Sequence, residues 1–177
     1  MIRIRIIHTD KWEEIYPAQT IYESSFPLEE KVAFSSLTTH EISSQCKIEL
    51  YAILNNEGTI GMVSLVIFPS FTFLFYLAIM PSEQGKGIGE QVLSIIKNQF
   101  PTPIILEVEY ATERLSERRI KFYTRNGFKL NTYPYTQPAL HPTTLPLDMH
   151  IMSYPNILVE KQFAEIQAAL YMHVYKV

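Results

Sequence analysis

Apolar residues in much of the chain recur at the spacing of β-strands. Residues 2–6 alternate apolar and polar side chains, which predicts a half-buried strand. Apolar runs at 47–54 and 59–68 are separated by the turn segment NNEG, which predicts a hairpin. The run at 71–80 is apolar and aromatic on both faces, so we expect a central strand that is buried on both sides and stopped by Pro81. The same reasoning predicts three later strands, at 103–110, 128–133 and 147–154.

Helical spacing of apolar residues predicts the remaining elements. A helix is expected over 10–24, where Pro17 should kink or split it, and a second short helix is expected over 28–37. Asn126 and Gly127 supply the C-terminal stop of a later helix. The other helices are predicted to begin near Ile88 and to span 113–126 and 157–174. Consecutive strands with few helices between them predict an α+β fold, with a mixed, mostly antiparallel central sheet flanked by helices.

Length and composition are typical of one globular domain. The chain has 177 residues, 47% of them hydrophobic, without repeats or an internal linker, so we expect a single domain over 1–177. A net charge of -3 at pH 7 argues against a nucleic-acid partner, which would need a basic face. The first residues have no signal-type apolar run, and no stretch reaches the ~20 apolar residues of a membrane span. We therefore expect a cytoplasmic protein without a membrane partner.

The cysteine and histidine content excludes two further kinds of site. Cys46 is the only cysteine, so an internal disulfide cannot form and a reducing compartment is favoured. The five histidines are dispersed, without metal-ligand spacing, so we expect no metal.

Glycines gather at one point of this glycine-poor chain. Three of the six glycines are Gly85, Gly87 and Gly89, between a predicted strand and a predicted helix. A glycine-rich turn lets the backbone approach an anion closely, and the first turn of a helix offers free N–H groups to it. The P-loop pattern fails because Glu90 follows the last glycine, and the dinucleotide pattern G-x-G-x-x-G fails in both registers. The pattern Q/R-x-x-G-x-G/A does fit, with Gln84 in first place.

Two segments together carry a resemblance to a known family. The segment LAIMPSEQGKGIG at 77–89 resembles the acetyl-CoA-binding motif of the GNAT acetyltransferase superfamily, and IKFYTRNGF at 120–128 resembles that superfamily's next motif. Their order and distance also resemble the family. The predicted elements match its fold over about 1–154, and the helix at 157–174 extends beyond this core.

The resemblance implies how acetyl-CoA would be bound. The edge of the strand at Leu77, Ala78 and Ile79 would pair with the pantetheine arm, and one N–H, that of Ala78 or Ile79, would polarise the thioester carbonyl. Gln84 would help shape the loop. The central strands would splay apart here to open a slot. The pyrophosphate would be held by main-chain N–H groups of Gly85, Lys86, Gly87, Ile88, Gly89 and Glu90.

Acetyl transfer to an amine needs a base for the amine and an acid for the leaving thiolate. Glu107 and Glu109 lie on one face of the strand after the slot, and either is a candidate base. The alternative is a carboxylate that pairs with a nearby arginine. Tyr123 matches the family's tyrosine and would be the acid, unless it only packs beside Phe122. Ser116 falls nearest the family's cofactor-binding Asn, although the link before it is about four residues longer here; it would otherwise be a helix N-cap.

These observations predict an N-acetyltransferase that transfers an acetyl group from acetyl-CoA to a primary amine, without a covalent enzyme intermediate. The alternative is a CoA-binding regulatory or sensor domain of the same fold that lacks turnover. The acceptor is a small amine or a peptide. The apolar stripe of Phe163, Ile166 and Leu170 on the terminal helix is expected to be buried, either against its own sheet or in a homodimer.

Overall fold

The computed structural model describes residues 1–8, 10–39, 41–112 and 114–177. In this part of the chain, nine strands form one mixed sheet with the order β1-β3-β4-β5-β6-β9-β7, to which β2 adds beside β3 and β8 beside β9. Only the β5–β6 pair is parallel, so the predicted mixed, mostly antiparallel sheet is confirmed. The strands are β1 (Arg3–Ile6), β2 (Glu41–Ser43), β3 (Cys46–Leu54), β4 (Thr59–Ile67), β5 (Thr72–Ile79), β6 (Ile104–Glu109), β7 (Lys129–Leu130), β8 (Tyr135–Gln137) and β9 (Leu147–Tyr154).

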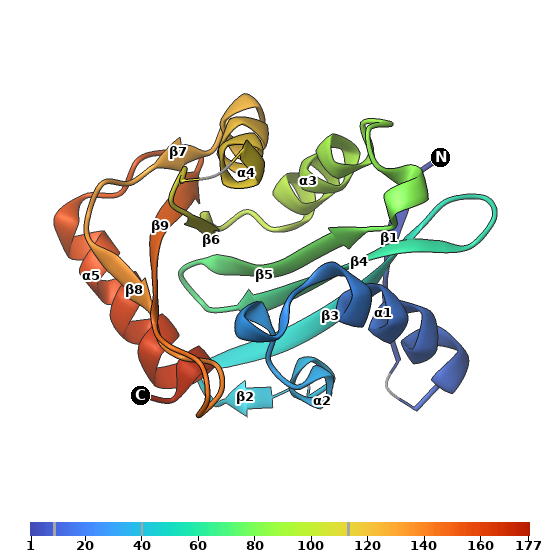
Figure 1. Cartoon of the computed structure of the whole chain (residues 1–177), viewed down its shortest axis with the longest axis horizontal. Coiled ribbons are helices and arrows are strands. Elements are labelled where there is room, and N and C mark those ends of the chain that lie inside the picture. Colours follow the sequence, from blue (N-terminus) through green and yellow to red (C-terminus); the bar gives the residue numbers. More distant parts are fainter. Residues whose placement is uncertain (9, 40, 113) are drawn as a thin grey trace.

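Helices cover both faces of this sheet (Figure 1). The apolar faces of α1, α2 and α5 pack into one core, and those of α3 and α4 pack into a second core on the other face. The helices are α1 (Trp12–Ser25), η1 (Leu28–Glu30), α2 (Phe34–Leu37), η2 (Pro81–Glu83), α3 (Ile88–Gln99), α4 (Arg114–Arg125), α5 (Glu160–Ala169) and η3 (Leu170–Tyr175), where η1 and η2 are 3₁₀-helices and η3 is a π-helix. No helix in the described ranges is long and apolar enough to cross a membrane.

Several predicted boundaries differ from the structure. Helix α1 runs through Pro17 without a break. The helix expected over 28–37 is two short helices, because the chain is extended at Lys31. The strand expected at 128–133 is reduced to β7, and the Pro-rich segment that follows, expected as a connection only, contributes β8 to the sheet beside β9.

The terminal helix packs against its own chain. Phe163, Ile166 and Leu170 are at most 8% exposed, and the Phe163 ring lies 4.9 Å from that of Tyr133 and 6.4 Å from that of Tyr135. Burial of one such side chain contributes roughly 1.5–3 kcal/mol. Of the two alternatives for this stripe, the structure shows packing in cis.

Two irregularities of the central strands shape the space between them. β5 and β6 pair only through Thr72–Ile104 and Phe73–Ile105, so beyond these residues the strands separate. We call this point the apex of the slot. On the other side of β5, Phe75 is an extra residue, because Leu74 pairs with Leu65 whereas Tyr76 pairs with Ser64. Such a β-bulge bends the strand and increases its twist, here directly beside the apex.

Candidate active site

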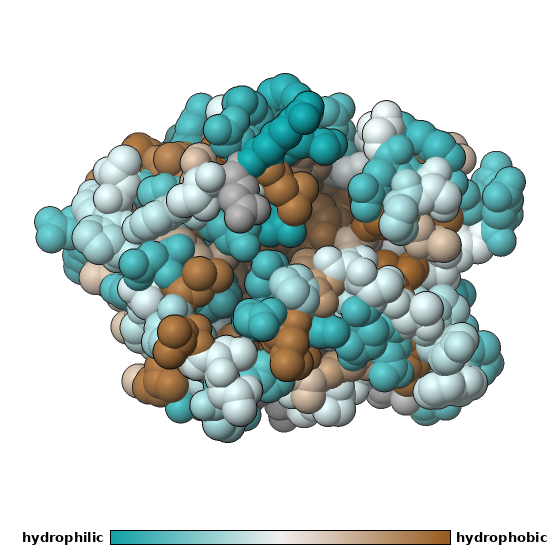
Figure 2. Space-filling view, in the orientation of Figure 1, coloured by the Kyte–Doolittle hydropathy of each residue, from teal (hydrophilic) through white to brown (hydrophobic). Residues whose placement is uncertain are grey.

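A cavity of about 860 Å³ fills the gap between β5 and β6. Its walls come from both strands, the glycine loop, α4, the α1–η1 segment and β8. Figure 2 shows this face hollowed near its centre, with apolar residues visible inside the hollow. The volume is in the range of small-molecule sites in proteins.

The glycine loop closes one end of the cavity at the start of α3. Gly85 and Gly87 have φ of +78° and +73°, a left-handed backbone that residues with a Cβ rarely adopt. A Cβ added at either would meet nothing within 4 Å, and both glycines line the cavity. Gly89 is needed for a different reason, because a Cβ there would lie 2.9 Å from Cζ of Phe122 on α4. Gly85 and Gly87 thus contribute to the cavity wall, and Gly89 lets α3 approach α4.

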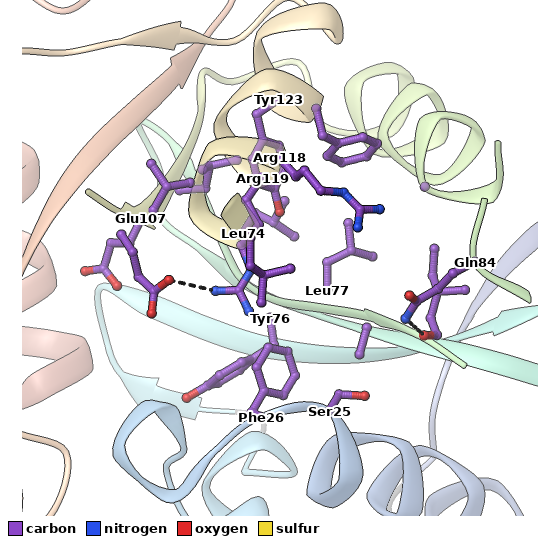
Figure 3. A pocket seen from close by; sticks show the side chains of 18 of the residues that line it. Ser25, Phe26, Leu74, Tyr76, Leu77, Gln84, Glu107, Arg118, Arg119 and Tyr123 are labelled. Carbon is purple, nitrogen blue, oxygen red and sulfur yellow. Dashed lines mark hydrogen bonds and ion pairs between the residues drawn. The ribbon is translucent and has the colours of Figure 1, made fainter. Parts of the chain in front are cut away.

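Gln84 holds the loop against the strand before it. Its side-chain Nε2 donates to the carbonyl oxygen of Ile79 at 2.8 Å. Lys86 forms an ion pair with Glu83 at 2.8 Å, and its side chain does not contribute to the cavity wall. Gln84 therefore connects the end of β5 to the start of α3, as Figure 3 shows.

The backbone of β5 turns selected N–H groups toward the cavity. Met80 N–H donates to Ile60 O on the β4 side. Because N–H directions alternate along a strand, Ala78 faces the same way, whereas Leu77 and Ile79 face the gap. The bond from Gln84 to the carbonyl of Ile79 agrees with this direction. Leu77, Ala78 and Ile79 line the cavity. Of these, Leu77 and Ile79 direct their N–H groups toward it, where a ligand could accept a hydrogen bond.

Tyr123 reaches the cavity from α4 (Figure 3). Its ring packs against Phe122 and Phe128, with centroids 5.1 and 5.6 Å away. Burial raises the pKa of Tyr123 to about 12, although the nearby Arg119 cation acts in the opposite direction. The phenol is thus protonated at physiological pH, and burial makes it a weaker acid than an exposed phenol.

Glu107 lies on β6 just beyond the apex, and neutral groups surround its carboxylate. Tyr135 donates to Oε1, Gln137 Nε2 donates to Oε2 at 2.7 Å, and the Tyr175 hydroxyl lies 2.8 Å from Oε1 and 2.7 Å from Oε2. Burial raises the pKa of Glu107, and the hydrogen bonds from these three groups act against that rise. In the described part of the chain, the hydrogen-bond partners of Glu107 are these neutral groups and not an arginine, which was the alternative considered for this residue.

Glu109, two residues further along β6, does pair with an arginine. Arg119 Nη1 lies 3.3 Å from its Oε2 and 3.7 Å from Oε2 of Glu30. Burial raises the pKa of Glu30 to about 7, and Arg119 opposes this while Glu109 reinforces it. One cation therefore serves two adjacent carboxylates in the cavity.

The sequence analysis did not identify Glu30. It lies in η1, and its segment is held in place by buried tyrosines: Tyr76 donates to the carbonyl oxygen of Glu30 at 2.9 Å and accepts from Val32 N–H at 3.2 Å. Tyr22 donates to the carbonyl oxygen of Val32 at 2.9 Å. Tyr76 and Phe26 also form the aromatic wall that faces α4 across the cavity (Figure 3). No short motif carries this arrangement, because its members lie far apart in the sequence.

Ser116 and the cationic residues of α4 occupy different faces of that helix. Ser116 is 2% exposed, lies within the first turn and does not line the cavity. Its position inside the helix also rules out the N-cap role. Arg118, Lys121 and Arg125 do line the cavity, and Arg125 lies 4.0 Å from Glu90 in the first turn of α3. Positive side chains thus stand beside the glycine loop. No group of three His, Cys, Asp or Glu side chains within the described ranges is placed to hold a metal ion.

Comparison with known proteins shows which proteins share this fold. Residues 47–130 match the family model described as an acetyltransferase (GNAT) domain. No curated protein matches the sequence. A solved structure from Bacteroides thetaiotaomicron, assigned to the GNAT family of acetyltransferases, is 28% identical, with 99% of each chain covered and a TM-score of 0.90.

Two more distant structures share the fold. The ribosomal-protein-S18-alanine N-acetyltransferase of Escherichia coli is 18% identical, with 91% of this chain and 97% of that chain covered and a TM-score of 0.58. A GNAT family acetyltransferase from Elizabethkingia anophelis with acetyl-CoA bound is 17% identical, with 86% and 96% covered and a TM-score of 0.52. The resemblance to the GNAT superfamily that the two sequence motifs carry is confirmed: residues 47–130 match its family model, and the chain shares the fold of solved GNAT acetyltransferase structures.

Proposed function

We propose that this protein transfers an acetyl group from acetyl-CoA to a primary amine by direct attack. The observation that carries the proposal is the slot itself. β5 presents an unpaired backbone edge along the cavity, and the glycine loop and the N-terminus of α3 lie at the open end of that edge. This geometry suits a long, thin donor with an anionic end, because an extended arm can pair with the strand while phosphates meet helix N–H groups.

The cofactor would be held by three parts of the chain. Main-chain N–H groups of the segment 85–90 would bind the pyrophosphate, and Arg118, Lys121 and Arg125 would add positive charge beside it. The N–H groups of Leu77 and Ile79 would pair with the pantetheine arm. Of the two donors expected for the thioester carbonyl, strand alternation favours Ile79 over Ala78.

Glu107 is the better of the two candidate bases. It lies nearest the apex, its pKa is raised by burial, and its partners are neutral groups, whereas Glu109 is engaged by Arg119. A lysine-like amine has a pKa of ~10.4 and must lose a proton before it attacks. Glu107 would accept this proton, directly or through water.

The transfer then balances with Tyr123 as the acid. The amine nitrogen forms a bond to the thioester carbonyl carbon, and the carbon–sulfur bond breaks. The departing thiolate takes the phenolic proton of Tyr123, which the solvent later replaces. The products are an N-acetylated amine and the thiol of coenzyme A.

The test measures thiol release and binding separately. The wild-type protein should release thiol from acetyl-CoA with at least one amine from a panel of polyamines, aminoglycosides, amino acids and peptides. Acetyl-CoA at 100 times its Kd should also raise the free energy of unfolding by about 2.7 kcal/mol, since the site exists only in the folded state. Stabilisation without thiol release with any amine would favour the regulatory or sensor alternative. Thermal unfolding indifferent to millimolar acetyl-CoA would contradict the CoA site.

A further inference from the structure

Tyr175, in the C-terminal π-helix η3, reaches the candidate active site from outside the family-model range of 47–130. Its hydroxyl lies 2.8 Å from Oε1 and 2.7 Å from Oε2 of Glu107, a residue 68 positions earlier in the chain. The hydroxyl is therefore within hydrogen-bond distance of both carboxylate oxygens and can donate its one hydrogen to either of them.

The ring of Tyr175 contacts the opposite wall of the slot. It meets the ring of Phe75 edge-on, with centroids 6.3 Å apart and an interplanar angle of 81°. Phe75 is the extra residue of the β-bulge on β5, whereas Glu107 belongs to β6. One side chain therefore touches both strands just beyond the last residues through which they pair.

The direction of the hydrogen bonds is set by Gln137 on β8. Its Nε2 can only donate, and it lies 2.7 Å from Oε2 of Glu107 and 3.3 Å from the Tyr175 hydroxyl. The Tyr175 oxygen thus accepts from Gln137 and gives its own hydrogen to Glu107. Tyr135 donates to the same carboxylate. All three donors are neutral, so they favour the ionised form of Glu107 without cancelling its charge.

The segment that carries Tyr175 is anchored to the rest of the molecule. η3 continues α5, whose Phe163 is buried against β8, and Leu170 at the junction is fully buried. Tyr171, one turn before Tyr175, donates to the carbonyl oxygen of Thr136 instead of to the site. A short π-helix of this kind is often found at functional sites.

We propose that Tyr175 is a positioning residue of the acetyl-transfer site, whose hydroxyl keeps the Glu107 carboxylate ionised and aimed into the slot while its ring braces the Phe75 bulge. The inference rests on the proposed function, and it extends the site to a segment outside the residues that match the family model. Tyr175 does not itself line the cavity, so its effect on the reaction passes through Glu107 and Phe75.

The experiment compares the pH dependence of kcat/KM for the wild type, Tyr175→Phe and Tyr171→Phe, with any accepted amine. Loss of a donor to the ionised form raises the pKa of Glu107, so the acidic limb of Tyr175→Phe should move up by about one pH unit, with kcat/KM about tenfold lower on that limb. Tyr171→Phe deletes a hydroxyl from the same segment that bonds the Thr136 carbonyl and the Gln167 side chain but not Glu107, so the acidic limb of this variant should not move. The Kd for acetyl-CoA should be unchanged in both.

Other titratable or charged groups near Glu107 can also contribute to the pH dependence of kcat/KM. Tyr135 faces it from β8 and Tyr76 from β5, while Glu30, Glu109 and Arg119 share the cavity. The limb is therefore compared between variants and not assigned to one group. Tyr135→Phe removes a second donor to the same carboxylate and should shift the limb in the same direction.

The outcomes separate this inference from the proposed function. A limb that shifts in Tyr175→Phe and Tyr135→Phe but not in Tyr171→Phe supports the positioning role. An unmoved limb in either of the first two, or an equal shift in Tyr171→Phe, overturns it. A Glu107→Gln variant with the kcat/KM of the wild type also overturns the positioning role, because that role acts through Glu107. Thiol release by this variant, whatever its rate, is still consistent with the proposed acetyl transfer. A wild type that releases no thiol with any amine overturns the proposed function itself.

Discussion

The two ends of the cavity are built in opposite ways. The end proposed for the cofactor, which we call the cofactor end, is formed by one continuous stretch, residues 77–90, with one face of α4 packed over it. The end proposed for the acceptor, which we call the acceptor end, is assembled from the α1–η1 segment, β5, β6, β8 and Arg119 of α4, with η3 behind it. At the first end, backbone N–H groups and glycine conformations define the site. At the second end, carboxylates, tyrosines and an arginine define it through contacts between distant residues.

Because of this difference, substitutions should have different effects at the two ends of the cavity. A site made from backbone in one segment keeps its shape as long as the glycines and the strand remain, so one shared donor can be bound by many sequences. A site made from side chains of several elements changes with each of them. We therefore expect substitutions at the cofactor end to alter the affinity for acetyl-CoA, and substitutions at the acceptor end to alter the rate, the acceptor or the pH dependence.

The largest effect is expected where the two ends meet. Tyr123→Phe removes the proposed acid but keeps the ring between Phe122 and Phe128, so kcat and kcat/KM should fall by about 10²–10⁴-fold while the calorimetric Kd for acetyl-CoA is unchanged. Tyr110→Phe is the matched control, because Tyr110 lies outside the cavity. A Tyr123→Phe enzyme with wild-type kcat would remove Tyr123 from the mechanism.

An added charge in the glycine loop should weaken the binding of acetyl-CoA with little effect on the distant core. Gly87→Asp places a carboxylate where the pyrophosphate would lie, and an unfavourable interaction of about 2–3 kcal/mol would weaken acetyl-CoA binding roughly 10²-fold. Gly58→Asp is the control, since Gly58 also has a positive φ and open space around it but lies in the β3–β4 turn. Equal calorimetric Kd values of the two variants for acetyl-CoA would contradict the role assigned to the glycine loop.

The smallest effect concerns stability at the acceptor end. The folded-state pKa of Glu30 is raised to about 7 by burial, so its contribution to stability is fully present below the ordinary pKa near 4.5 and is lost as the pH rises through 7. Glu30→Gln imitates the protonated side chain and should gain stability relative to the wild type between pH 5 and pH 8, by about 1–3 kcal/mol. Denaturant midpoints at the two pH values measure this, with the exposed Glu29→Gln as control. A difference that stays constant with pH would show that burial does not perturb Glu30.

The sequence predicted the cofactor end much more fully than the acceptor end, for a physical reason. The glycines, Gln84 and the strand edge are neighbours in the chain, and their spacing has a chemical meaning by itself. Glu107 and Glu109 were predicted to share a face, and both line the cavity. Alternation could not reveal that Arg119 pairs with Glu109 while neutral donors surround Glu107, because the partners come from α4, β8 and η3.

Glu30 illustrates what local patterns leave out. Its position depends on a hydrogen bond from Tyr76, 46 residues later, and on the extended segment between η1 and α2, which the apolar spacing of 28–37 assigned to one helix. β8 was missed for a similar reason. Its three residues lie in a proline-rich segment that indicates a connection, and their pairing with β9 is visible only in the folded chain. The terminal stripe was predicted to be buried, but only the three-dimensional structure could show against what.

The short pairing between β5 and β6 has a consequence for the surface chemistry of the sheet. A strand edge left open is usually a hazard, because any extended chain can add to it and start aggregation. Here the edge lies inside the molecule, with α3 and α4 over one face of the sheet and the α1–η1 segment over the other. We therefore expect the slot to admit a thin extended chain more readily than a strand with its own side chains. The shape of the slot would thus discriminate against wide ligands before any charged group of the ligand is recognised.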